Sequence, residues 1–107
     1  MRDGAVSLSK NTGVAYFLLN EGLNEVKIGY SKSVAGAHKR MKTQQTGNPR
    51  PLVFIGCVKS SVVLGTTERQ LHKRFRRWRV SRAGREWFTS EIIPEIKKLV
   101  AQYGVES

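Results

Sequence analysis

Basic side chains gather in one segment of the sequence, with no acidic residue among them. Residues 69–85 contain eight Lys or Arg residues, seven of which are Arg, and Trp78 lies in their midst. A solvated helix face usually interleaves Glu with Lys, whereas the planar fork of Arg matches two phosphate oxygens at once. We therefore expect the segment to bind a nucleic-acid backbone rather than to serve solubility alone. The residues expected to contact nucleic acid are Arg69, Lys73, Arg76, Arg77, Arg79 and Arg82 in and around this segment, with His38 and Lys42 earlier in the chain.

Glu68 is the acidic residue whose position suggests that it binds a metal ion or another partner. Leu64, Leu71, Phe75 and Trp78 recur at helical spacing, so residues 66–79 are predicted to form an amphipathic helix that rests on a sheet. Glu68 lies only about 40° from the axis of the apolar stripe, where a carboxylate is partly desolvated unless a partner or a metal ion holds it. The alternative is an ordinary first-turn Glu that interacts with the helix dipole, worth about 0.3–1 kcal/mol.

Composition narrows the class of protein further. The chain has 107 residues and a net charge of +11, with 19 Lys and Arg against 8 Asp and Glu, which favours polyanionic partners. With Cys57 alone no intrachain disulfide forms, and Cys57 with two His residues falls short of a structural zinc site. The longest apolar run, residues 14–19, is too short to span a membrane. An anionic membrane surface ranks below nucleic acid because the basic helix has no large free apolar face.

The remaining sequence predicts the elements that position these residues. Residues 14–19 and 26–30 are predicted strands of a hairpin whose loop spans residues 20–24, and residues 51–58 form a third strand that buries Cys57. Residues 33–45 are a predicted helix, and a last helix begins at a cap formed by Thr89 or Ser90, with Pro94 in its first turn. The predicted order is β-β-α-β-α-α. We expect an α+β single domain spanning residues 1–107, with its core at about 13–103 and a flexible N-terminus over residues 1–10.

Several short motifs follow one another in an order that is typical of one superfamily. They are Gly-Val-Ala-Tyr at 13–16, Val-Lys-Ile-Gly at 26–29, Arg40, Gln-Thr-Gly-Asn-Pro at 45–49, Glu68 with His72 and Phe75, and Glu-Trp-Phe at 86–88. Together they resemble the GIY-YIG nuclease superfamily, and more narrowly its branch common in phage and bacterial proteins whose second motif reads Lys-Ile-Gly, the meiotically up-regulated gene 113-like domain. The resemblance implies a small three-stranded antiparallel sheet flanked by helices. It also implies metal-dependent hydrolysis of a nucleic-acid phosphodiester by an activated water.

The resemblance assigns catalytic roles to four residues. Tyr16 matches the phenol that activates or positions the attacking water, and Arg40 matches the guanidinium that contacts the scissile phosphate. Glu68 matches the carboxylate that holds a divalent ion, Mg²⁺ or Mn²⁺. Lys27 stands where many members carry a second Tyr, and its ammonium is expected to polarise water, lower the pKa of the phenol or neutralise phosphate.

Three further residues are expected to support these four. Gln44 follows Arg40 by one helical turn, at a position where some relatives carry a His, and is expected to orient a ligand or to serve structure alone. His72 is expected to orient Glu68 or to touch phosphate, or equally to be a satisfied histidine at the boundary of the core. Tyr30 is a weaker substitute for the missing phenol, because three positions along a strand reverse the direction in which a side chain faces.

The leading hypothesis is a metal-dependent endonuclease that nicks or cuts DNA. One alternative is the same fold catalytically impaired by Lys27, acting as a nucleic-acid-binding or regulatory inhibitor protein, and another is a basic domain that binds an acidic protein. A homodimer, and a protein partner that supplies sequence specificity, stay open. We expect the protein in the cytoplasm of a bacterial or phage-infected cell, associated with nucleic acid and not with a membrane.

Overall fold

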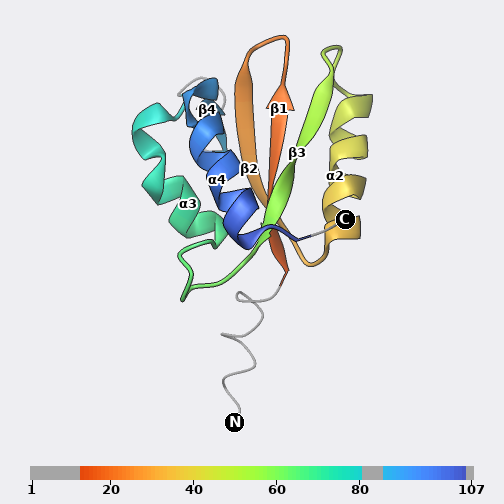
Figure 1. Cartoon of the computed structure of the whole chain (residues 1–107). Helices are drawn as coiled ribbons and strands as arrows, with labels where there is room; N and C mark the ends of the chain where they lie inside the picture. Colours follow the sequence, from red (N-terminus) through yellow and green to blue (C-terminus); the bar gives the residue numbers. More distant parts are fainter. Residues whose placement is uncertain (1–12, 81–85, 106–107) are drawn as a thin grey trace.

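The structure, a computed structural model, describes residues 13–80 and 86–105, and these form an antiparallel sheet with helices on both faces (Figure 1). The predicted N-terminal segment 1–10 lies outside the described residues. The strands are β1 (Val14–Asn20), β2 (Glu25–Ser31), β3 (Leu52–Lys59) and β4 (Trp87–Thr89). The helices are α2 (Val34–Thr46), α3 (Glu68–Arg74) and α4 (Ile93–Tyr103), with short 3₁₀ turns at Arg76–Trp78 and Ser90–Ile92.

The sheet has four strands in the order β3-β1-β2-β4, so the prediction of three strands is wrong. The extra strand, β4, has three residues and pairs only with the first residues of β2, from Glu25↔Thr89 to Lys27↔Trp87. A strand this short shows no periodicity of its own by which the sequence could predict it. The order of elements is therefore β-β-α-β-α-β-α rather than β-β-α-β-α-α.

Both faces of the sheet are covered, and for this reason β1 is apolar at every position from Val14 to Leu19. One cluster contains Ala15, Phe17 and Ile28 with residues of α3 and α4. The other contains Tyr16 and Cys57 with residues of α2. Cys57 is 1% exposed, which confirms its predicted role as buried packing.

The first three predicted elements and the hairpin loop agree with the structure to within about two residues. Ser33 caps α2, its Oγ accepting a hydrogen bond from the N–H of Gly36 at 2.9 Å. The loop between β1 and β2 covers residues 21–24 and ends at Asn24, whose φ of 57° is a left-handed conformation that Asn tolerates.

The later helices differ from their predictions. The single helix predicted over 66–79 is wrong, because α3 ends before Phe75 and a 3₁₀ turn follows. Phe75 and Trp78 are three residues apart, and a 3₁₀ turn keeps such a pair on one side as well as an α-helix does, so spacing does not separate the two. The predicted cap at Thr89 or Ser90 is also wrong: α4 begins at Ile93, with Pro94 in its first turn as expected.

Within the described residues, no helix combines the length and the apolar character that crossing a membrane requires.

Candidate functional site

The register of the β1–β2 hairpin decides which predicted residues share a face. Tyr16 pairs with Gly29 and Leu18 pairs with Lys27, so the side chains of Tyr16 and Lys27 both lie on the α2 face of the sheet. Tyr30 pairs with Ala15 and lies on the opposite face, as its distance from Lys27 along the strand predicts. Tyr30 therefore does not replace the missing phenol beside Tyr16.

Tyr16 is 1% exposed, and its ring lies over β2. A Cβ atom on Gly29 would overlap the ring and the hydroxyl of Tyr16, so glycine at this position makes room for the phenol. Arg40, from α2, hydrogen-bonds the Tyr16 side chain. Burial raises the pKa of Tyr16 above its ordinary value, and the charge of Arg40 opposes that rise. Tyr16 is therefore a neutral phenol at pH 7, positioned by an arginine.

Lys27 is half-buried beside a carboxylate that the sequence reading did not assign to the site. Its Nζ lies 3.9 Å from Oε1 of Glu86. Burial lowers the pKa of Lys27, and the charge of Glu86 opposes that change. Glu86 is held at this place because its carbonyl accepts a hydrogen bond of 3.0 Å from the N–H of Ile28. Its position directly before Trp87 in the Glu-Trp-Phe motif was the only signal in the sequence.

Glu68 is the first residue of α3 and lies beside β2. A capping box between Thr67 and Gln70 fixes the start of this helix. His72, one turn later, places Nε2 3.6 Å from Oε2 of Glu68 and 2.8 Å from the carbonyl oxygen of Ile28. Since a carbonyl oxygen only accepts hydrogen bonds, Nε2 carries the proton and donates a hydrogen bond to the carbonyl of Ile28. His72 thus lies between Glu68 and β2.

The four predicted catalytic residues lie within one electrostatic environment. The charges of Arg40 and Glu68 each affect the pKa of both Tyr16 and Lys27. Burial raises the pKa of Glu68 itself, and the charges of His72, Lys27 and Arg40 oppose the rise. β1, β2, α2 and α3 therefore bring a phenol, an amine, a guanidinium and a carboxylate together, and Glu86 joins them as a second carboxylate.

The other predicted site residues differ in their surroundings. Gln44 is half-buried on α2, and Lys42 is exposed on the same helix. His38 stacks on Phe54 with ring centroids 4.0 Å apart, and its Nε2 is buried with no hydrogen-bond partner among the described residues. His38 thus packs between α2 and β3 rather than presenting this nitrogen to a phosphate.

The basic residues of α3 and the following turn are exposed. They are Arg69, Lys73, Arg74, Arg76, Arg77 and Arg79. Arg74 pairs with Glu95 at 3.5 Å, and the guanidinium of Arg77 lies 5.2 Å from the Trp78 ring centroid. Arg82, also predicted to bind nucleic acid, lies outside the described residues.

Metal binding at this site would rest on few protein ligands. The part of the chain that the structure describes contains no group of three or more His, Cys, Asp or Glu residues suited to a metal ion. A single half-buried carboxylate still fits Mg²⁺, which keeps several waters and commonly takes one or two carboxylates together with substrate phosphate oxygens. Glu68 is such a carboxylate, and the residues present therefore fit the implied ion.

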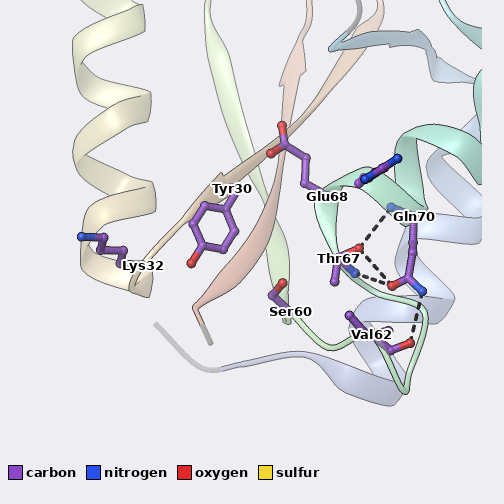
Figure 2. Close-up of a pocket in the computed structure, with 8 residues that line it drawn as sticks. Tyr30, Lys32, Ser60, Val62, Thr67, Glu68 and Gln70 are labelled. Atoms are coloured by element: carbon purple, nitrogen blue, oxygen red, sulfur yellow. Dashed lines mark hydrogen bonds between the residues drawn. The ribbon is translucent and has the colours of Figure 1, made fainter. Parts of the chain in front are cut away.

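A pocket of about 590 Å³ opens beside Glu68 (Figure 2). Its lining comes from the end of β2, from the segment after β3 and from the start of α3. The lining side chains include Tyr30, Lys32, Val62, Thr67 and Arg69. Tyr30 thus lines a cavity on the opposite face of the sheet from Tyr16.

This α+β fold is that of a GIY-YIG-related domain, as the family to which the chain belongs shows. The chain belongs to the T5orf172 domain family, whose match covers residues 13–103. No curated protein and no solved structure shows significant similarity to the chain.

Proposed function

We propose that this protein is a metal-dependent endonuclease that hydrolyses nucleic-acid phosphodiester bonds by nicking or cutting DNA. The observation that carries the proposal is the convergence of Tyr16, Lys27, Arg40 and Glu68 from four elements upon one site. Membership of a GIY-YIG-related family supports it. The motif Lys-Ile-Gly at residues 27–29 supports the narrower proposal that the chain belongs to the meiotically up-regulated gene 113-like branch.

Each residue would have a distinct task in the hydrolysis. Water attacks phosphorus and the bond to the leaving oxygen breaks, so negative charge accumulates on the phosphoryl oxygens. The proton that the attacking water loses passes to solvent, and the leaving oxygen takes up a proton from solvent. The Tyr16 hydroxyl would orient the water by a hydrogen bond, because its pKa is too high for it to be a phenolate at pH 7. Arg40, exposed on α2, would bind two phosphoryl oxygens, and the ammonium of Lys27 would stabilise the charge that develops.

Glu68 would hold the divalent ion, Mg²⁺ or Mn²⁺, with the rest of its shell supplied by water and phosphate. A bound ion of this kind stabilises the leaving oxygen and the developing charge. His72, fixed by its hydrogen bond to the carbonyl of Ile28, would orient Glu68 from 3.6 Å away. The other potential ligand near the site, Glu86, is engaged with Lys27.

Plasmid cleavage tests this proposal. Supercoiled plasmid is incubated at low salt with wild-type protein, Glu68→Gln or Glu21→Gln, in Mg²⁺, in Mn²⁺ or in chelator. Glu21 is a matched control because it is an exposed Glu in the β1–β2 loop, so both variants remove one carboxylate. We expect metal-dependent nicking by wild type and Glu21→Gln, and a loss of about a hundredfold or more in Glu68→Gln. No nicking by the wild type on plasmid, branched or single-stranded DNA would contradict the proposal.

A second function is favoured by the ion pair between Lys27 and Glu86. If that pair keeps the amine away from substrate, the protein would bind nucleic acid without turnover, as an accessory or regulatory protein. The same assay separates the two functions, because salt-sensitive binding with no metal-dependent product is the result that a binding protein gives.

A further inference from the structure

The pocket beside Glu68 has no task in the hydrolysis described above. Tyr16 and Lys27 face α2, whereas the pocket is lined by Tyr30 and the start of α3 on the other side of β2. Glu68 borders both regions. Figure 2 shows Tyr30 on one side of the pocket, and Thr67 and Gln70 on the other. A ligand in this pocket would therefore lie directly next to the residue proposed to hold the metal ion.

The walls of the pocket are held in place by hydrogen bonds within the protein. The N–H of Gln70 donates to Oγ1 of Thr67 at 3.1 Å, within the capping box of α3. Nε2 of Gln70 also donates to the carbonyl oxygen of Val62 at 3.1 Å. This bond ties the turn after β3 to α3, so Val62 is held at the mouth of the pocket. The volume, about 590 Å³, lies in the range of preformed small-ligand sites.

The chemistry of the lining suits a nucleobase better than a phosphate alone. A phosphate needs cations, and the exposed Lys32 and Arg69 provide them at the rim. The aromatic ring of Tyr30 and the half-exposed side chain of Val62 add nothing to phosphate binding. An unstacked base, in contrast, lies against an aromatic face and makes hydrogen bonds along its edge. Oγ1 of Thr67 donates to Oε1 of Gln70 at 3.0 Å and keeps a lone pair that can accept from a base N–H.

Building on the proposed function, we propose that this pocket takes one unpaired nucleobase next to the scissile phosphate. A base inside an intact duplex is stacked between its neighbours and does not reach a protein pocket. The preferred substrate is then a nucleic acid with an unpaired nucleotide at the cut, such as a bulge, a flap or a junction of single and double strand. Lys32 and Arg69 at the rim hold the phosphates that flank this base.

The test measures binding in chelator, so that no cleavage is needed. Fluorescence anisotropy gives Kd for a fully paired DNA duplex and for the same duplex with one unpaired adenine. We expect the wild type to bind the bulged duplex about tenfold more tightly, the size of one base–aromatic stack. The ratio of the two Kd values cancels the backbone contribution that both duplexes share.

Three variants connect the preference to the pocket. Tyr30→Leu removes the stacking ring, and Val62→Asp places a charge at the mouth. Val63→Asp is the matched control for Val62→Asp, because Val63 is 94% exposed in the same turn and outside the lining. We expect the Kd ratio to fall to about one in Tyr30→Leu and Val62→Asp, and to stay near ten in Val63→Asp. If Tyr30→Leu does not fold, the two Asp variants decide the matter.

Two results would overturn the inference: equal Kd values for the two duplexes in the wild type, or a preference that survives in Val62→Asp as fully as in Val63→Asp. Plasmid cleavage separates this inference from the proposed function. If the wild type prefers the bulged duplex but does not cut plasmid, the inference about the pocket stands and the proposed nuclease function fails. If the wild type cuts plasmid but binds both duplexes equally, the proposed nuclease function stands and the inference about the pocket fails.

Discussion

Lys27 is the residue at which this site departs most from the superfamily pattern it resembles. It is half-buried, and its ammonium only donates hydrogen bonds, whereas a phenol at the same position both donates and accepts them. Its neighbour Glu86 lies 3.9 Å away and favours the charged form, while burial favours the neutral one. The net lowering of its pKa means that Lys27 loses its charge at a lower pH than an exposed lysine does.

The pH dependence of cleavage tests whether the charge of Lys27 matters. If the ammonium stabilises the developing phosphoryl charge, kcat falls as pH rises through the lowered pKa of Lys27. Glu86→Gln removes the group that favours the charged form, so this fall should begin at a lower pH than in the wild type. Lys27→Arg keeps its charge throughout and should show no such fall between pH 7 and pH 10.

Rates measured across this pH range, on one substrate at saturating metal, give the comparison. Glu91→Gln serves as the control, because Glu91 is an exposed acid outside the site. A rate that increases where Lys27 loses its proton would mean instead that the neutral amine acts as a base.

The free energy of unfolding tests the role of Glu68 independently of cleavage. Burial raises its pKa in the folded protein, so the folded state binds its proton more tightly than the unfolded chain does. The free energy of unfolding therefore decreases as pH rises from the ordinary carboxyl pKa through the raised one. Glu68→Gln removes this cost and should unfold at an equal or higher temperature than the wild type at pH 7, and the difference should disappear below about pH 4.5.

A Glu that serves only the dipole of α3 predicts the opposite sign, with a loss of about 0.3–1 kcal/mol in Glu68→Gln at pH 7. Thermal unfolding of the two proteins at pH 4 and pH 7 separates these outcomes. A loss of stability at pH 7 would show that the carboxylate is structural, whatever its effect on cleavage.

At the scale of elements, β2 assembles the site. It carries Lys27 on one face, its Ile28 carbonyl accepts from His72, and its Ile28 N–H donates to the carbonyl of Glu86. The face of Lys27 was predictable, because strand alternation is written in the sequence. The position of Glu86 beside Lys27 was not predictable, because it depends on the pairing of Lys27 with Trp87, which lies far along the chain. The end of α3 before Phe75 could not be predicted either, because apolar spacing does not distinguish an α-helix from a 3₁₀ turn.

Gly29 tests how closely β1 and β2 must approach for Tyr16 to lie in place. Gly29→Ala adds a Cβ that would overlap the Tyr16 ring, which is enclosed and has no room to move away. We expect a loss of about 1–3 kcal/mol in the free energy of unfolding, the usual cost of overpacking, together with a large loss of cleavage.

Gly47→Ala is the matched control for this substitution. Gly47 follows α2 with an ordinary negative φ, and a Cβ there would meet no atom within 4 Å. Its unfolding free energy should stay within about 0.5 kcal/mol of the wild type. Chemical denaturation of the three proteins checks both expectations, and equal stabilities for the two alanine variants would contradict the packing argument.

At the scale of the whole molecule, the charged surfaces lie on opposite faces of one sheet. Arg40 and Lys42 belong to α2, whereas the exposed basic residues that begin at Arg69 belong to α3 and the turn after it. β4 covers β2 only from Glu25 to Lys27, and α3 lies along the rest of that edge, with Glu68 at its start (Figure 1). A nucleic acid that reaches from one basic surface to the other across this edge passes the proposed metal ligand.

The salt dependence of DNA binding tests whether α3 and its turn take part in this contact. Each phosphate that a basic residue neutralises adds about 0.9 to the slope of log K against log salt. The double variant Lys73→Gln/Arg76→Gln should therefore lower the magnitude of the slope by about 1.8. Lys97→Gln/Lys98→Gln removes the same charge from exposed positions on α4 and should change the slope by less than about 0.5. Equal changes in both double variants would mean that DNA responds to the net charge of +11 as a whole rather than to a surface formed by α3.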